Sequence, residues 1–164
     1  MGDPRRLKKK FKKPAHPYEK ERMMEELEFL GKYGLRNKKE FWKSRTMLGK
    51  WRSIARQSRS LSREKAIEVQ NTLIKKLQRL GVMGAEAEFE DVLHLTVEDV
   101  LKRRLQTLVY EKGLAKTIYG ARQKIVHNHI QVGNKRINSP SYIVKKEEED
   151  LVTFAPSSPF VTST

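Results

Sequence analysis

Residues 103–144 read RRLQTLVYEKGLAKTIYGARQKIVHNHIQVGNKRINSPSYIV and combine two helical patterns with a strand hairpin. The apolar residues that recur there at helical spacing are Leu105, Leu108, Val109, Ile118, Ala121, Ile125 and Val126. The basic and polar residues between them are Arg103, Arg104, Lys116, Thr117, Arg122, Gln123, Lys124, His127 and His129. One face of each helix can therefore pack while the other presents hydrogen-bond donors to a polyanion.

A strand pattern follows these two helices. Ile130 and Val132 alternate with polar residues, Gly133-Asn134 supplies a two-residue turn, and residues 135–137 return as a second strand. Residues 142–145 and 151–154 indicate two further strands, separated by an acidic turn. We therefore expect an α+β fold in which a helical arm precedes a small module of a helix-turn-helix and an antiparallel sheet.

Three amphipathic helices are expected before this module. Their apolar stripes are Met23, Leu27, Leu30 and Tyr33 in residues 19–34; Phe41, Leu48, Trp51 and Ala55 in the helix that begins at Asn37; and Ala66, Val69, Leu73, Leu77 and Leu80 in residues 63–80. These residues recur at steps of three and four, which places them on one helical face. Residues 85–95 indicate an acidic loop with at most one short helical turn.

Local signals mark the helix ends. The candidate N-caps are Asn37 with Glu40, Ser60 or Ser62, Thr96 with Asp99, and Thr117; the candidate stops are Gly34, Gly81, Gly84, Gly113 and Asn128. The helix opened by Thr96 is expected to run without a break to the turn at Gly113.

The chain divides into four regions on this basis: a basic extension at 1–18, a helical region at 19–100, the module at 101–154 and a flexible tail at 155–164. The first 18 residues hold too little apolar bulk to fold alone, so we expect them to be disordered until their charge is neutralised. They are either a solvated tail or localisation signal, or an extension that threads between phosphates.

The formal net charge is +15 and the isoelectric point is about 10.1. Residues 1–60 carry +12 (19 basic, 7 acidic), residues 61–100 carry −3 (5 and 8), and residues 101–164 carry +6 (11 and 5). A nucleic acid is therefore the first partner to consider, ahead of an anionic membrane surface. Because no apolar run approaches spanning length, we expect no membrane partner. The two basic ends are expected to grip the partner while the middle packs.

Several chemistries lack the residues they need. The chain has no cysteine, which excludes disulfides, thiol catalysis and cysteine-ligated zinc. No apolar segment follows the basic start, so we expect no secretory signal. The carboxylates of residues 86–91 have no nucleophile or ligand set beside them, and His127 with His129 lacks a third metal ligand. We expect no enzyme, no cofactor and no metal site.

The predicted RNA contacts lie in both basic regions. In the arm they are Arg5, Arg6, Lys8, Lys9, Lys10, Lys12, Lys13, Lys43, Arg45, Lys50, Arg52, Arg56 and Arg59; in the module they are Arg103, Arg104, Lys116, Thr117, Arg122, Gln123, Lys124, His127, His129, Lys135 and Arg136. Arginines suit bidentate phosphate contact, which favours Arg104, Arg122, Arg52 and Arg56. Trp51 is expected in the core, whereas Trp42 lies off the apolar stripe and either packs or stacks on a base.

The segments LQTLVYEKGLAKTIYGARQKIVHNHI, IQVGNKRI and PSYIV resemble the RNA-binding module of the S4 family of small-subunit ribosomal proteins. MGDPRRLKKKFKKPAHPYEKER, YGLRNKKEFW and DVLHLTVEDVLKRRLQTLVY resemble the archaeal and eukaryotic branch of that family, whose eukaryotic members are called S9. The resemblance covers nearly the whole chain.

This resemblance implies a structural constituent of the small ribosomal subunit, cytoplasmic and ribosome-bound. It implies ribosomal RNA binding early in assembly, a place near the messenger RNA entry path, and neighbouring small-subunit proteins as partners. It also implies that the RNA-facing surface of the module is carried by Lys116, Thr117, Arg122, Gln123, Lys124, His127 and His129. Two features depart from the family pattern: the hairpin turn reads Gly133-Asn134-Lys135 instead of Asn-Gly-Lys, and the cysteines that hold zinc in some members are absent.

Two alternatives carry the same module. An RNA-modifying enzyme would need a catalytic domain, and the residues before the module are few for one. A free stress-related RNA binder fits the module but does not fit the ribosomal type of N-terminus.

Overall fold

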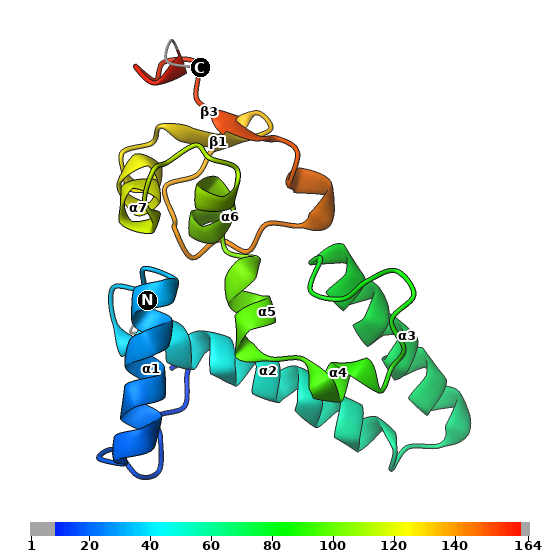
Figure 1. The fold of residues 1–164 in the computed structure, drawn as a ribbon. Coiled ribbons are helices and arrows are strands. Elements are labelled where there is room, and N and C mark those ends of the chain that lie inside the picture. The colour runs from blue at the N-terminus through cyan, green and yellow to red at the C-terminus, as the bar shows by residue number, and fades with distance from the viewer. Residues whose placement is uncertain (1–8, 162–164) are drawn as a thin grey trace, which may run out of the picture.

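The computed structural model describes residues 9–161 and has an α+β fold, as predicted. The helices are α1 (Lys20–Lys32), α2 (Lys38–Ser58), α3 (Arg63–Arg79), α4 (Asp91–His94), α5 (Val97–Lys102), α6 (Leu105–Glu111), α7 (Ile118–Val126) and the 3-10 helix η1 (Lys146–Glu148); the strands are β1 (Ile130–Val132), β2 (Lys135–Arg136) and β3 (Val152–Phe154). Helices α1 to α5 form an arm, and the module of α6, α7 and the sheet sits at one end of it (Figure 1).

Helix α2 organises the arm, because α1, α3, α4 and α5 all pack against it. Its predicted stripe is confirmed: Leu48, Trp51 and Ala55 are buried with Leu73 and Leu77 of α3 in one core cluster. The Asn37 side chain accepts a hydrogen bond from the Glu40 backbone N–H at 3.2 Å. The predicted side-chain cap at the start of α3 is wrong, since Ser62 makes no capping hydrogen bond and the Ser60 hydroxyl donates to the Gln57 carbonyl.

The predicted apolar stripe of α1 is confirmed in part: Tyr33 is buried, Leu30 packs against the same cluster and Met23 is half-buried, but Leu27 departs from it. Leu27 is 51% exposed, whereas Glu26 is 1% exposed. Burial of a carboxylate requires partners, and Glu26 has three: Arg22 at 2.5 Å, the Trp42 indole N–H at 3.0 Å and Lys38 at 3.3 Å. This polar cluster turns the helix so that Leu27 faces solvent.

The helix predicted from Thr96 to Gly113 is broken in two at Arg103 and Arg104, which corrects the sequence interpretation. Thr96 and Asp99 do form the predicted capping box. However, the Leu105 N–H donates to the Tyr142 carbonyl at 2.8 Å, and the Val144 N–H donates to the Arg103 carbonyl at 3.0 Å. These backbone groups are therefore unavailable for intrahelical bonds. The strand predicted at 142–145 is only an isolated bridge at this break.

The module closes around one core that includes Leu105, Ile125, Ile130 and Val144, each 0% exposed. Its antiparallel sheet has the order β2-β1-β3. The Thr117 hydroxyl accepts the predicted capping bond from the Gly120 N–H at 3.0 Å. One prediction is wrong: Val126 is 50% exposed, and the fully buried residues of α7 are Ala121 and Ile125.

Turns at both ends of β1 have the predicted conformations. Asn128 has a φ of 61°, and Gly133 has a φ of 58° at the first turn position, where a type II′ turn requires a positive value. The strands pair with Val132 opposite Lys135, so the hairpin has the two-residue turn that the sequence predicts.

Both terminal segments lie against the rest of the chain where the structure describes them. The tail was expected to be loosely held, but Ala155 and Ser158 are buried, and the Ala155 N–H donates to the His129 carbonyl at 2.8 Å. Residues 9–18 form no helix or strand, and the Lys12 N–H donates to the Thr46 hydroxyl at 3.0 Å. Within residues 9–161, no helix is long and apolar enough to cross a membrane.

Candidate nucleic-acid interface

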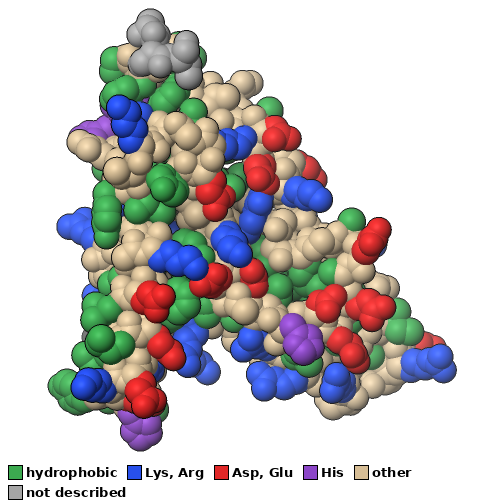
Figure 2. All heavy atoms as spheres, viewed as in Figure 1, with side chains coloured by type: hydrophobic (Ala, Val, Ile, Leu, Met, Phe, Trp, Pro, Cys, Tyr) green, Lys and Arg blue, Asp and Glu red, His purple; other side chains and the backbone are tan. Residues whose placement is uncertain are grey.

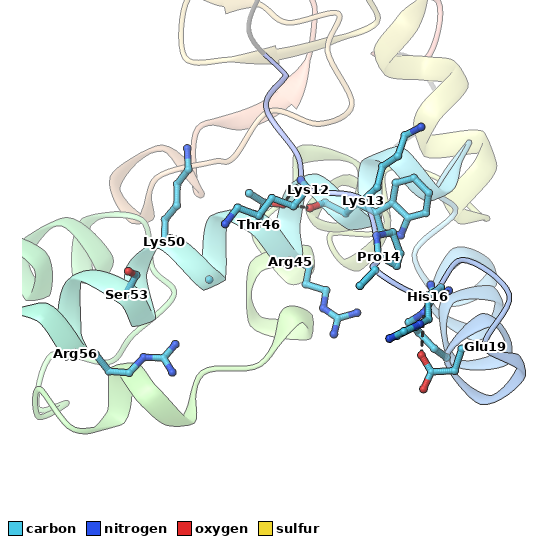
Figure 3. A pocket seen from close by; sticks show the side chains of 14 residues that line it. Lys12, Lys13, Pro14, His16, Glu19, Arg45, Thr46, Lys50, Ser53 and Arg56 are labelled. Carbon is cyan, nitrogen blue, oxygen red and sulfur yellow. Dashed lines mark hydrogen bonds and ion pairs between the residues drawn. The ribbon is translucent and has the colours of Figure 1, made fainter.

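A groove of about 710 Å³ runs between residues 12–16 and α2. Lys12 and Lys13 line it from the extended segment, and Arg45, Lys50 and Arg56 line it from α2 (Figure 3). The acidic residue in the lining, Glu19, pairs with Arg22 at 3.5 Å. Basic side chains also gather along α2 beside the notch that separates α1 from the rest of the arm (Figure 2).

Exposed cations of α2 and of its C-cap, Arg59, have no intramolecular counter-ions within the described part of the chain. Lys43, Arg45, Lys50, Arg56 and Arg59 are exposed, and none of them forms an ion pair with a described carboxylate. Such a row of like charges repels itself unless a polyanion neutralises it. The predicted contacts Lys9, Lys10, Lys12 and Lys13 are likewise exposed, whereas Arg5, Arg6 and Lys8 lie outside the described residues.

The module presents a smaller set of exposed polar groups. Lys116, Gln123 and His127 are exposed on α7 and its flanks, and Lys135 with Arg136 forms the exposed edge strand β2. Thr117 is exposed, but its hydroxyl caps α7. These groups can donate to phosphates without breaking the fold.

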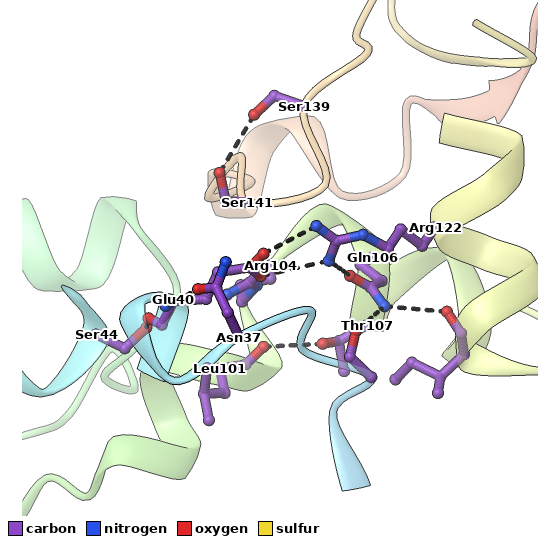
Figure 4. Close-up of polar contacts among 12 residues, drawn as sticks. Asn37, Glu40, Ser44, Leu101, Arg104, Gln106, Thr107, Arg122, Ser139 and Ser141 are labelled. Carbon is purple, nitrogen blue, oxygen red and sulfur yellow. Dashed lines mark hydrogen bonds and ion pairs between the residues drawn. The ribbon is translucent and has the colours of Figure 1, made fainter. Parts of the chain in front are cut away.

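Two arginines that the sequence favoured for RNA contact are instead bound to Glu40. Arg104 is 3% exposed and donates to the Glu40 carboxylate at 2.5 Å, and Arg122 donates to the same carboxylate at 2.8 Å (Figure 4). Arg122 also donates to the Gln106 side chain at 3.2 Å. Burial alone would raise the pKa of Glu40, but hydrogen bonds from Arg122 and Arg104 hold that pKa below its ordinary value. Arg104 therefore joins the module to α2 and is buried within the chain.

Three further predicted contacts are engaged inside the protein. Arg103 donates to Glu149 at 2.7 Å and to the Val144 carbonyl at 3.2 Å. Arg52 donates to the Leu95 carbonyl at 2.6 Å. Lys124 donates to the Leu114 carbonyl at 2.8 Å, and its ammonium lies 4.2 Å from the centre of the Phe160 ring. Their positive charge can still contribute to the field around the protein, but their donors hold loops together.

Packing explains Trp42, Trp51 and His129, whereas His127 is exposed. The Trp42 indole N–H donates to Glu26, and the Trp42 ring lies 6.0 Å from that of Phe11, which gives the residue a structural role. Trp51 is buried, as predicted. The His127 and His129 rings are 6.3 Å apart, and His129 meets Phe160 edge-on at 5.1 Å. No group of three potential metal ligands occurs among residues 9–161.

Sequence reasoning did not single out several residues that line the groove. His16, Thr46, Gly49 and Ser53 lie in it beside the predicted cations. A signal for three of them was present, because Thr46, Gly49 and Ser53 follow one another at steps of three and four, and Gly49 lies four residues after Arg45. The helical face that carries Arg45 therefore identifies them once α2 is known to be helical there.

The buried glutamates predict a loss of stability in acid. Burial raises the pKa of Glu26, but its hydrogen bonds to Trp42, Arg22 and Lys38 outweigh this, so the pKa of Glu26, like that of Glu40, lies below the ordinary value of about 4.5. A lowered pKa stabilises the fold above the ordinary value and loses that effect as pH falls through the folded-state pKa. We expect the free energy of unfolding to decline below about pH 4.5, as measured by urea titrations at several pH values. This decline should be smaller in the Glu40→Gln variant than in the wild type. Equal declines in the two proteins would show that the pKa of Glu40 does not contribute to the acid dependence of stability.

Taken together, three features define the class of RNA-binding proteins: the helix-turn-helix, the small sheet and the exposed cations without counter-ions. Residues 103–150 match the family model described as S4 domain. The chain is 49% identical over 160 residues to the small ribosomal subunit protein uS4 of Ignicoccus hospitalis, covering 98% of this chain and 96% of that protein. It is 51% identical over 160 residues to uS4 of Hyperthermus butylicus (98% and 91% covered), and 48% identical over 159 residues to uS4 of Methanothermobacter thermautotrophicus (97% and 93%). The chain belongs to the uS4 family of small ribosomal subunit proteins.

Proposed function

We propose that this protein is a structural constituent of the small ribosomal subunit that binds ribosomal RNA between its helical arm and its module. The observation that carries the proposal is the row of exposed α2 cations without described counter-ions, facing a groove that residues 12–16 complete. RNA is gripped mainly through its phosphates and shape, and exposed lysines and arginines supply the donors for that contact. Family membership supports a structural role and gives no support to catalysis.

The proposed contact set follows from exposure. It consists of Lys9, Lys10, Lys12, Lys13, Lys43, Arg45, Lys50, Arg56, Arg59, Lys116, Gln123, His127, Lys135 and Arg136, with Arg5, Arg6 and Lys8 added from the basic start of the chain. Arg104, Arg122 and Arg103 form the frame that orients the two basic surfaces. Substituting these three arginines would weaken RNA binding indirectly, by changing how the two basic surfaces are oriented relative to each other.

We extend the proposal to the place of the protein in the particle. Its partners are small-subunit ribosomal RNA, neighbouring small-subunit proteins and the messenger RNA near its entry path. It acts early in assembly, in the cytoplasm. The resemblance of both the module and the N-terminal region to one ribosomal family supports this extension. Co-sedimentation with small subunits, followed by protein–RNA crosslink mapping, tests it and separates it from a free RNA binder.

Binding to a small-subunit RNA transcript should weaken steeply as salt rises. Each phosphate neutralised contributes roughly −0.7 to −0.9 to the slope of log affinity against log salt. A variant with Arg45, Lys50 and Arg56 changed to glutamine should lose about two to three from that slope, measured by filter binding at several salt concentrations. The matched control changes Lys65, Lys75 and Lys76, exposed on α3, to glutamine and removes the same net charge. Salt-insensitive binding of the wild type would refute the proposal.

A further inference from the structure

Gly49 lies in the interior of α2, where glycine has no visible use to the protein itself. Glycine is the poorest helix former after proline. Gly49 is not among the described residues with positive φ, it is exposed, and a Cβ built on it would meet no heavy atom within 4 Å. Neither backbone conformation nor internal packing therefore requires a glycine at this position.

The position of Gly49 is as informative as its lack of contacts. It lines the groove formed with residues 12–16, and it also lines a second groove of about 810 Å³ between α1, α2 and α5. The two grooves share Arg45, Gly49 and Arg56 of α2, together with Glu19 and Arg22 at the start of α1, and Gly49 is the shared residue with no side chain. Ser53 follows Gly49 by four residues, about one helical turn, and lines the first groove. Figure 3 shows Arg45, Ser53 and Arg56 along α2 in that groove.

The surroundings indicate what crosses α2 at Gly49. Arg45, Lys50 and Arg56 are exposed without described carboxylate partners, and Arg45 and Arg56 line both grooves, so an anion that crosses α2 meets these two cations. The second groove is also lined by four glutamates, Glu19, Glu21, Glu25 and Glu98, of which Glu19 pairs with Arg22 and Glu98 with Lys32. A glycine allows the backbone of a ligand to approach the protein closely. A chain of phosphodiesters has both the charge and the continuous length that two grooves joined at a low point require.

We propose that the sugar–phosphate backbone of ribosomal RNA crosses α2 at Gly49 and passes from one groove into the other, with Arg45 and Arg56 on its phosphates. This inference rests on the proposed function and adds to it a specific crossing point. The backbone lies close to the helix axis there because no Cβ stands between them. Gly49 thus contributes to binding because the absence of a side chain leaves room for the RNA backbone.

The test compares stability and RNA affinity in the same variants. Gly49→Ala should raise the melting temperature of the free protein by about 2–4 °C, because alanine favours the helix and meets no neighbour. The same change should weaken binding to a small-subunit RNA transcript, and Gly49→Leu should weaken it by about tenfold or more, as expected when a charge-assisted phosphate contact is displaced. General damage to the fold would lower both stability and RNA affinity, so it cannot produce a variant that is more stable and binds RNA more weakly.

Gly31 provides the matched control. It is an exposed residue of α1, and a Cβ there also meets nothing within 4 Å, but it lines neither groove. Gly31→Ala and Gly31→Leu should leave RNA affinity unchanged. Unchanged affinity in both Gly49 variants, with salt-dependent binding intact in the wild type, would overturn the crossing point and leave the proposed function standing. Loss of stability in Gly49→Ala, or an equal loss of affinity in the Gly31 variants, would also overturn it, and a wild type without salt-dependent binding would overturn both proposals.

Discussion

Glu40→Ala is expected to lower the free energy of unfolding by about 3–5 kcal/mol, because it removes one partner of a buried ion pair. Glu40 accepts from Arg104 at 2.5 Å and from Arg122 at 2.8 Å. The Arg104 side chain is 4% exposed, so in the variant its charge would stay buried without a counter-ion, whereas Arg122, at 22%, can turn to solvent. Most of the loss therefore comes from Arg104. Urea denaturation at neutral pH, followed by circular dichroism, measures it.

Two further variants make this result specific. Glu147→Ala removes an exposed carboxylate and should change stability by no more than about 0.5 kcal/mol. The double variant Glu40→Leu with Arg104→Met replaces the pair with apolar groups and should recover part of the loss, because no unpaired charge remains buried. A Glu40→Ala protein as stable as the Glu147→Ala control would show that the pair does not hold the module on the arm.

The second large effect is expected from Gly34→Ala, which should lower the free energy of unfolding by about 2–5 kcal/mol. Gly34 has a φ of 56°, a left-handed conformation that disfavours a Cβ. A Cβ there would lie 2.7 Å from Gln106 Nε2 and 2.9 Å from Ile118 Cγ2. Gln106 Nε2 also donates to the Gly34 carbonyl at 2.9 Å, so it cannot move away without breaking this bond. Strain in the backbone and crowding between arm and module therefore add.

Gly113 separates these two contributions. Its φ is 71°, but a Cβ there would meet no heavy atom within 4 Å. Gly113→Ala should therefore show only the left-handed penalty of about 1–2 kcal/mol. The difference between the two variants, measured by the same denaturation experiment, reports the crowding at the junction. If both substitutions destabilise the protein equally, then Gly34 does not need close packing against Gln106.

Short-range signals predicted the local structure well. Thr96 with Asp99 forms its capping box, Thr117 caps α7, Asn128 takes the left-handed conformation, and the hairpin turns at Gly133. Each signal depends on hydrogen bonds or steric limits within about four residues, which a sequence displays directly. The stripe of α2 was equally readable, because helical periodicity brings its apolar residues to one face.

The errors share a long-range cause. The helix break at Arg103 and Arg104 arises from backbone bonds to Tyr142 and Val144, far along the chain. Leu27 faces solvent because Glu26 takes the buried position among its three partners. In both cases a contact distant in sequence overrides a local pattern, and periodicity alone contains no information on such contacts.

Composition and spacing alone indicated the α+β class and the basic arm, because charge totals, caps and periodicity are properties of neighbouring residues. The family came from the resemblance of whole sequence segments to the S4 family. Which arginines remain free for a polyanion was settled only by the folded chain. Glu40 pairs with Arg104 and Arg122, which lie 64 and 82 residues away in the sequence. No local sequence pattern around these residues predicts the pairing. A cation becomes part of the frame or part of the binding surface according to which carboxylate the fold brings beside it, and that depends on three-dimensional packing.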